Sequence, residues 1–342
     1  MSAPNPPKPL SLARERTPAP ASSEEGTEYI RAWHERESFG ADPVDAFVLI
    51  LKTSGCYWAR VRGCTMCGYA KETLGRAASR EEIEAQVSRA LRAYRDEPYV
   101  KIFTSGSFLD PSEVPVDARK AVAEAFRGRA RRLLFESLPE FLTEESVGGM
   151  RDAFGGEIEV AVGLETTQDE VLRRSVDKVS TVAEYLESAA RVRRAGGLTK
   201  AYLLLKPPYL SEREAVEDAV TSIRRSAPYF STISVNPVHI QNGTMVEHLW
   251  HRGLYRPPWL WSLVETMARG KQALPEGVRL VSFPTSGGNR RGVHNCLSCD
   301  PGILKEIERA SLTQDFTHLA DLPECGCREQ WKWNEGLEAL VP

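Results

Sequence analysis

Apolar runs recur six times along the chain, and each run ends in polar or glycine residues. A near-continuous apolar run is typical of a strand that is buried on both faces, as in a parallel sheet. We therefore predict strands within residues 46–56, 99–107, 132–137, 157–166, 199–208 and 231–238.

Amphipathic segments follow these runs and predict helices. Three of them begin with capping boxes, formed by Ser79 with Glu82, Thr181 with Glu184, and Ser211 with Glu214. A further short helix is expected ahead of the first strand, at residues 28–36. Six alternations of strand and helix predict an α/β fold with a parallel sheet and right-handed crossovers. The polar segments after the strands then meet at one edge, where such folds assemble their sites.

Length and charge narrow the class of protein. The chain has 342 residues, of which 42% are hydrophobic, and a formal net charge of -3. This length suits one barrel-type domain with additions as well as two ordinary domains. The mild acidity argues against a protein that coats nucleic acid, although it leaves room for a local basic face. No apolar run approaches the roughly 20 residues of a membrane span, so we expect no membrane association.

All seven cysteines fall into two groups, and the first reads Cys56-x7-Cys64-x2-Cys67. Their odd number and metal-like spacing suit a reducing cytoplasm better than a disulfide scaffold. Three thiolates can hold a [4Fe–4S] cluster and leave one iron open, where S-adenosylmethionine (SAM) can chelate. Zinc is the alternative, but it would need a fourth ligand, and none is obvious nearby.

The second group consists of Cys296, Cys299, Cys325 and Cys327. Four thiolates in two tight pairs satisfy a closed tetrahedral zinc site, and a second iron–sulfur cluster is the alternative. We favour structural zinc, which would fix a C-terminal extension in which Trp331 and Trp333 supply apolar packing.

The cysteine loop after the first strand, the Ser/Gly turn after the second and the Glu after the fourth resemble the radical SAM superfamily. The seven-residue first spacing departs from the usual C-x3-C-x2-C. Five strings over residues 50–240 resemble the radical SAM subunit of archaeosine synthase: GCYWARVRGCTMCGY, KIFTSGSFLDPSEVP, FESLPEFLTEE, GLETTQDEVLRRSVDK and YLLLKPPYLSE. The later VHNCLSCD also fits this group of tRNA-modifying proteins, which are related to the elongator catalytic subunit.

The resemblance implies a partial (β/α)6 TIM-like barrel of the radical SAM type with a C-terminal metal-stapled extension. On this basis we expect a disordered N-terminal tail at 1–27, a radical SAM core at 28–245 and the extension with the four-cysteine site at 246–342.

The resemblance also implies residue roles. Cys56, Cys64 and Cys67 would ligate the cluster, and Met66 would lie against the adenine of SAM through its thioether. The turn after the second strand would contact the methionine amino group of SAM, unless it is an ordinary strand-to-helix turn. It comprises Thr104, Ser105, Gly106 and Ser107.

Three charged residues end predicted strands. Glu165 matches the position that contacts the ribose hydroxyls of SAM, and a solvated loop acid is the alternative. Glu136 would serve SAM or the substrate, or would only accept a structural hydrogen bond. Lys206 would pair with the SAM carboxylate or a substrate anion, or would be a surface lysine.

The implied reaction is the last step of archaeosine formation. A lysine-modified 7-deazaguanine in the tRNA D-arm would lose its lysine skeleton by radical C–N cleavage, with the lysine-transferring archaeosine synthase subunit as partner. The rivals are a radical SAM enzyme on another RNA base or small molecule, and a non-enzymatic binding module with zinc at both cysteine groups. Candidate phosphate contacts lie in three basic stretches, 126–132, 191–194 and 289–291.

Overall fold

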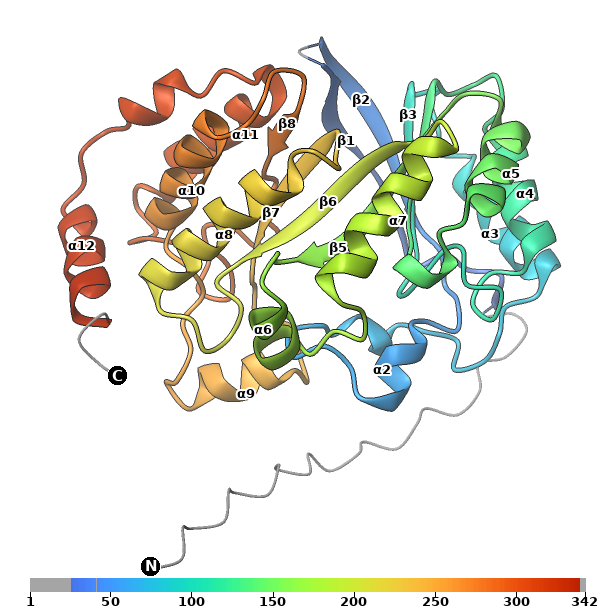
Figure 1. The fold of residues 1–342 in the computed structure, drawn as a ribbon. Coiled ribbons are helices and arrows are strands. Elements are labelled where there is room, and N and C mark those ends of the chain that lie inside the picture. Colours follow the sequence, from blue (N-terminus) through green and yellow to red (C-terminus); the bar gives the residue numbers. More distant parts are fainter. Residues whose placement is uncertain (1–25, 41, 339–342) are drawn as a thin grey trace, which may run out of the picture.

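The computed structural model describes residues 26–40 and 42–338. Eight strands form one sheet in chain order, and the sheet curls into a half-barrel (Figure 1). The strands are β1 (Arg31–Phe39), β2 (Asp42–Ile50), β3 (Tyr99–Phe103), β4 (Arg132–Glu136), β5 (Glu157–Glu165), β6 (Leu198–Leu205), β7 (Thr232–Pro237) and β8 (Arg279–Val281). Strands β2 to β8 are parallel. The six predicted strands correspond to β2–β7, so the α/β prediction is confirmed.

Helices connect the parallel strands. The α-helices are α2 (Tyr57–Val61), α3 (Arg80–Ala90), α4 (Val116–Ala125), α5 (Glu144–Phe154), α6 (Asp169–Val171), α7 (Val182–Arg194), α8 (Glu212–Ser226), α9 (Met245–His251), α10 (Leu260–Gln272), α11 (Asp300–Thr313) and α12 (Cys327–Glu338). Shorter helical turns are η1 (Tyr69–Lys71), η2 (Pro139–Phe141), η3 (Leu172–Val176, a π-helix) and η4 (Thr317–Ala320). The capping boxes predicted for α3, α7 and α8 are all present.

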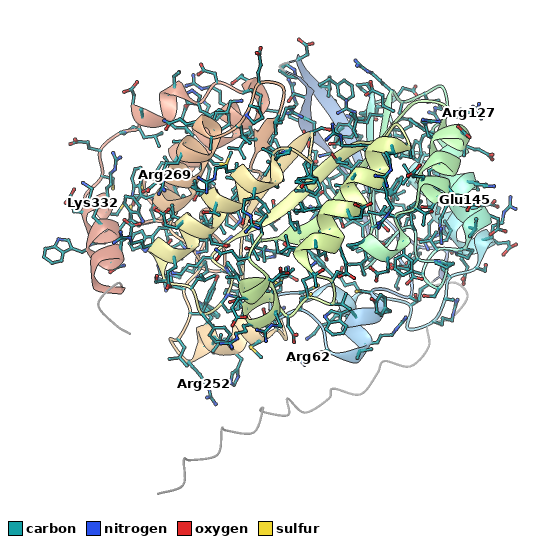
Figure 2. All side chains as sticks on the ribbon, in the orientation of Figure 1. Arg62, Arg127, Glu145, Arg252, Arg269 and Lys332 are labelled. Carbon is teal, nitrogen blue, oxygen red and sulfur yellow. The ribbon has the colours of Figure 1, made fainter. Side chains whose placement is uncertain are left out.

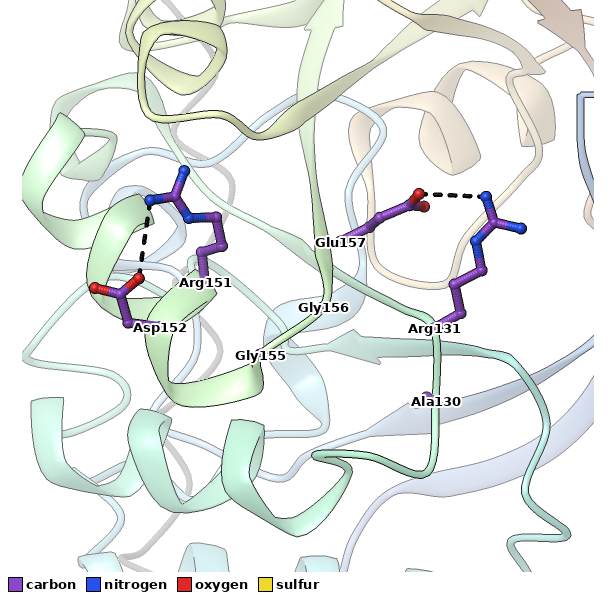
Figure 3. A pocket seen from close by; sticks show the side chains of 7 residues that line it. All are labelled: Ala130, Arg131, Arg151, Asp152, Gly155, Gly156 and Glu157. Atoms are coloured by element: carbon purple, nitrogen blue, oxygen red, sulfur yellow. Dashed lines mark hydrogen bonds and ion pairs between the residues drawn. The ribbon is translucent and has the colours of Figure 1, made fainter.

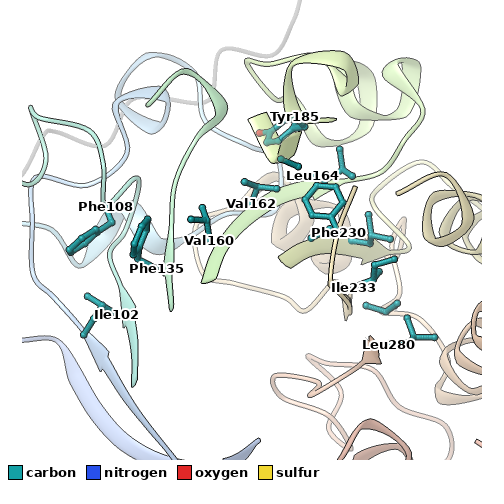
Figure 4. Packing of buried hydrophobic residues seen from close by; sticks show 14 of the residues in the cluster. Ile102, Phe108, Phe135, Val160, Val162, Leu164, Tyr185, Phe230, Ile233 and Leu280 are labelled. Carbon is teal, nitrogen blue, oxygen red and sulfur yellow. The ribbon is translucent and has the colours of Figure 1, made fainter. Parts of the chain in front are cut away.

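The apolar core lies between the sheet and these helices. Figure 4 shows side chains of β3, β4 and β5, such as Ile102, Phe135 and Val160, in one layer with Tyr185 of α7. Since alternate residues of a strand point to opposite faces, the other half of each strand faces the inside of the half-barrel. That inner face carries far more polar and charged residues.

The helix predicted at residues 28–36 is wrong, because most of this segment forms β1. Strand β1 pairs antiparallel with β2 along its whole length, from Arg31 opposite Ile50 to Phe39 opposite Asp42. Glu35 and Glu37, two residues apart, both bind the ammonium group of Lys101 on β3. The residues of this strand that point to the inside of the sheet therefore include acids, one half-buried and one buried, which a search for apolar periodicity does not detect.

The buried charges lie inside the half-barrel, where Glu37 of β1 meets Lys101 of β3 and Lys200 of β6. Glu37 is 1% exposed, and the ammonium group of Lys200 lies 3.5 Å from its carboxylate. Burial alone would raise the pKa of Glu37, but attraction to Lys101 and Lys200 outweighs burial and lowers this pKa to about 2. These pairs neutralise charge that would otherwise be buried alone.

Residues beyond 245 complete the same sheet. Strand β8, which the sequence did not predict, pairs with β7, and α11 packs against β8, β1 and β2. Helix α9 begins at Met245, where we expected the radical SAM core to end. Residues 1–25 of the predicted tail lie outside the described residues. Within residues 26–40 and 42–338, no helix has the length and apolar character needed to cross a bilayer.

Candidate active site

The first cysteine group lies in the loop that leaves the carboxyl end of β2. Cys56 is the residue at the start of α2, and Cys64 and Cys67 follow this helix. Burial is the main cause that raises the pKa of the Cys64 thiol to about 12, while the charge of Lys178 opposes this shift and the nearby Cys67 and Cys56 add to it. All three cysteines belong to this one loop, as the ligands of a single metal centre would.

The cysteine loop is fastened to the segment that follows β5. The backbone N–H of Thr65 donates to the carbonyl of Val176 at 3.0 Å, and its hydroxyl donates to the carbonyl of Ser175 at 2.6 Å. The indole N–H of Trp58 donates to the carbonyl of Asp177 at 2.8 Å. The loop thus has a fixed position relative to the end of β5.

A second attachment joins the loop to the segment after β7. The N–H of Gly68 donates to the side-chain oxygen of Gln241 at 2.6 Å, and the N–H of Val246 donates to the carbonyl of Thr65 at 3.2 Å. Met66 is partly buried against an apolar cluster that also contacts Cys64. Helices α2, α6 and α9 lie together over this end of the strands (Figure 1).

Gly106, in the turn after β3, lies directly against Cys56. A Cβ atom at Gly106 would stand 2.6 Å from both the backbone nitrogen and the Cα of Cys56, and 2.3 Å from a carboxylate oxygen of Glu113. Real Cβ atoms do not approach backbone this closely. The glycine is therefore required for the turn and the cysteine loop to meet.

The other turn residues differ in what their side chains contact. Ser107 is buried, its hydroxyl lies 2.8 Å from that of Ser137, and it accepts from the N–H of Leu138 at 2.9 Å. Thr104 is also buried, whereas Ser105 is partly exposed. Of the three hydroxyl-bearing residues predicted to contact SAM, Ser105 is the most exposed.

Glu165 ends β5 and forms a buried ion pair that the sequence did not reveal. Its carboxylate lies 2.9 Å from the ammonium nitrogen of Lys178, and both side chains are about nine-tenths buried. Burial alone would lower the pKa of Lys178, but attraction to Glu165 outweighs burial and raises it well above its usual value. The ion pair with Lys178 holds the Glu165 carboxylate in place at the strand end, where it could accept from hydroxyl groups.

Replacing Lys178 by Met is expected to destabilise the fold by about 3–5 kcal/mol, because Glu165 would be left as a buried charge without its partner. The double variant Lys178→Met/Glu165→Gln should recover most of this loss. Lys332→Met is the matched control, since Lys332 and Glu329 are also 2.9 Å apart but exposed. Urea unfolding measures all three. If Lys178→Met and Lys332→Met lose the same free energy of unfolding, burial does not strengthen the Lys178–Glu165 pair as we assigned.

Glu136 ends β4 inside the half-barrel mouth. Burial raises the pKa of Glu136 to about 7, a hydrogen bond from Tyr202 opposes this shift, and the charge of Glu165 adds to it. A carboxyl group with these surroundings changes protonation near neutral pH.

Folding stability is therefore expected to fall as pH rises from about 4.5 to 7, because the folded state then holds a proton that the unfolded state has released. Glu136→Gln should remove about 2–3 kcal/mol of this pH dependence. The exposed Glu145 of α5 provides the control, Glu145→Gln. Urea unfolding of the wild type, Glu136→Gln and Glu145→Gln at pH 5 and pH 7.5 measures this pH dependence. If the stability of Glu136→Gln changes between the two pH values as much as that of the wild type, the assignment is wrong.

Lys206 is buried and has a carboxylate partner. Its ammonium nitrogen lies 2.5 Å from Glu212 at the start of α8, and Glu212 also accepts from the N–H of Trp259 at 2.7 Å. An anion would have to compete with Glu212 for Lys206. Among the described residues, sequence reasoning also missed Glu113, whose carboxylate accepts from the Thr53 hydroxyl at 2.6 Å. The run KIFTSGSFLDPSEVP contains Glu113, but nothing local marks it as buried.

Comparisons of the chain with known proteins agree with a radical SAM site. Residues 50–219 match the radical SAM superfamily. The chain is 39% identical over 321 residues to "Archaeosine synthase subunit beta" of Methanosarcina acetivorans, covering 92% of this chain and 90% of that protein. It is 38% identical to the protein of the same name from Thermococcus kodakarensis, covering 88% and 95%. The chain therefore belongs to the radical SAM superfamily, in the family of archaeosine synthase β subunits.

A solved structure, the archaeal Elp3 of Methanocaldococcus infernus, is similar with a TM-score of 0.48 and 15% identity, covering 63% of this chain and 55% of that one.

As a member of the superfamily the chain is a radical SAM enzyme, so the alternative of a non-enzymatic binding module is wrong. The residues present fit the implied cofactors, because the loop with its three thiols and the turn at Gly106 follow the carboxyl ends of adjacent strands and meet at Cys56.

Proposed function

We propose that this chain is the radical subunit of an archaeosine synthase and that it converts lysine-modified 7-deazaguanine in the tRNA D-arm to archaeosine by radical C–N cleavage. The observation that carries this proposal is 39% and 38% identity to two proteins named archaeosine synthase subunit beta, over most of each chain. Their name also supports a partner, the lysine-transferring subunit. The seven unpaired cysteines suit the reducing cytoplasm.

In this proposal Cys56, Cys64 and Cys67 hold a [4Fe–4S] cluster, and Met66, the turn at 104–107 and Glu165 contact SAM. When bound, these cofactors supply the one-electron chemistry that yields a 5′-deoxyadenosyl radical for hydrogen abstraction. The task of the protein is to bind, to orient and to exclude water. Lys178 fixes Glu165, Gly106 lets the turn reach the cysteine loop, and the cover of α2, α6 and α9 limits access of water.

The position of the basic stretches supports one tRNA contact over the others. Arg291 donates to Glu247 of α9 at 2.7 Å, so the stretch 289–291 lies beside the cover of the site, and Arg290 is exposed. Figure 2 shows Arg62 and Arg252 on this same side of the molecule and Arg127 on the opposite side.

The stretches 126–132 and 191–194 lie at the amino ends of the strands, away from the cysteine loop. Arg131 and Glu157, 3.3 Å apart, line a hollow of about 720 Å³ at that edge (Figure 3). Arg194 pairs with Glu144 at 2.6 Å. We therefore propose that residues 289–291 contact a tRNA phosphate near the reacting base, where cations favour binding of the polyanion.

Anaerobic incubation of the protein with SAM, a reductant and tRNA that carries the lysine-modified base tests the proposed function. Nucleoside mass analysis should show loss of the lysine-modified base and formation of archaeosine. A matched reaction with tRNA that lacks the lysine group should yield no archaeosine. If SAM is cleaved but the lysine-modified base persists, the enzyme acts on another substrate.

A further inference from the structure

The four cysteines of the second group come together at the starts of two helices. Cys299 immediately precedes α11, and Cys327 is the first residue of α12. All four sulfur atoms lie within 4.8 Å of one another. The sulfur of Cys296 lies 3.5 Å from that of Cys299 and 3.7 Å from that of Cys325.

These separations match one metal ion better than a cluster. Four thiolates at about 2.3 Å from a tetrahedral ion stand about 3.8 Å apart. A [4Fe–4S] cluster places four irons and four sulfides between its ligands, so its cysteine sulfurs must lie farther apart. The set is also closed, since four protein ligands leave no position for a substrate, which is the arrangement of a structural site.

Two N–H donors beside the cysteines suit negatively charged sulfur, although the carboxylate of Asp300 also lies 3.7 Å from the sulfur of Cys299. The indole N–H of Trp261 donates to the sulfur of Cys327 at 3.3 Å, and the amide of Asn295 donates to that of Cys299 at 3.7 Å. Such donors orient the ligands of a metal ion and stabilise their charge. The predicted packing of Trp331 is confirmed, as it is buried and donates to Ser262 of α10 at 2.8 Å, whereas that of Trp333 is wrong, since Trp333 is 69% exposed.

The residues just before Cys296 hold the segment that covers the active site. The N–H of Ile240 donates to the carbonyl of Arg291 at 2.6 Å. The guanidinium of Arg291 donates to Asn242 at 2.9 Å and to Glu247 of α9 at 2.7 Å. Residues 240–247 are thus fixed from one side by Arg291.

The same segment holds the cysteine loop from its other side, through Gln241 to Gly68 and through Val246 to Thr65. A short series of contacts therefore leads from Cys296, along residues 291–295, through α9 and its preceding loop, to the loop of the first cysteine group. Each contact is a hydrogen bond or the covalent chain itself.

We propose that Cys296, Cys299, Cys325 and Cys327 bind one zinc ion, and that this ion fixes residues 291–295 and thereby holds α9 against the cysteine loop of the active site. Thiolate ligands in a tetrahedral set select zinc among the common divalent ions. The role is positional, since these four cysteines form a group separate from the three that are assigned to the cofactors. It goes beyond the proposed function, because zinc content and mobility of α9 do not depend on which substrate is used.

Metal analysis of the full chain, purified anaerobically, is the first test. The wild type should contain one zinc and about four irons per chain. Cys325→Ser should lose the zinc and retain the iron, whereas the control Ser298→Ala, an exposed residue of the same loop, should retain both metals. A wild type with about eight irons and no zinc would overturn the zinc assignment in favour of a second cluster.

Hydrogen exchange tests the positional role. Cys325→Ser should exchange at least tenfold faster at residues 240–251 and 64–68, with β3–β5 unchanged. Arg291→Ala, which alters no cysteine, should show the same faster exchange while it retains zinc, so the test survives if the cysteine variant is poorly folded. Exchange that rises only in α11 and α12 in the cysteine variant, or stays unchanged in Arg291→Ala, would overturn the proposed support of α9.

Discussion

Cys64→Ala is expected to remove the iron of the active site and all cleavage of SAM. Three thiolates are the minimum for a [4Fe–4S] cluster with one open iron, so the loop has no ligand to spare. The half-barrel should still fold, because its core lies between the sheet and the outer helices and Cys64 only borders a smaller apolar cluster.

Iron analysis, visible absorbance and the yield of 5′-deoxyadenosine measure this effect. Cys296→Ala is the matched control, since it removes a thiol from the second group and should keep the iron near Cys56. A Cys64→Ala protein with full iron content and wild-type cleavage of SAM would contradict the assignment of the cluster to this loop.

Gly106→Ala is expected to be nearly as damaging, although it adds only one methyl group. The added Cβ would stand 2.6 Å from the backbone of Cys56 and 2.3 Å from Glu113, so the turn and the cysteine loop cannot both keep their positions. We expect SAM affinity to fall at least a hundredfold, which corresponds to about 2.7 kcal/mol, with partial loss of iron.

Gly148→Ala supplies the control. Gly148 lies in α5, and a Cβ there would meet nothing within 4 Å. Alanine also favours a helix by about 1 kcal/mol over glycine. Titration of SAM into each anaerobic protein by calorimetry compares the two variants. If Gly106→Ala binds SAM as well as Gly148→Ala does, the close approach to Cys56 has no bearing on the cofactor site.

The regular part of the fold could be predicted because its signals are local. A capping box needs only four residues, and the boxes starting at Ser79, Thr181 and Ser211 are present as expected. Strand β1 was missed because its inward residues, Glu35 and Glu37, are charged and find their partner on β3, at Lys101. Strand β8 has only three residues and depends on β7 for pairing.

The site shows the same division. Cysteine spacing is visible in the sequence, and so are strand ends such as Glu165. Lys178 is not, because it reaches Glu165 only through the π-helix η3 and the left-handed backbone of Asp177. Gln241 binds Gly68 from 173 residues away, and no local pattern predicts such a contact. Long-range contacts therefore decide how the cysteine loop is held, while local patterns decide where it begins.

We propose that, in the reaction described above, the hydrogen atom is abstracted from the lysine group of the tRNA substrate. The most direct test of this proposal is an anaerobic reaction with tRNA whose modified base carries perdeuterated lysine, followed by mass analysis of the 5′-deoxyadenosine formed. We expect deuterium in the 5′-deoxyadenosine and archaeosine in the tRNA. With Cys64→Ala we expect neither deuterated 5′-deoxyadenosine nor archaeosine. Archaeosine formed with only unlabelled 5′-deoxyadenosine would contradict this proposal.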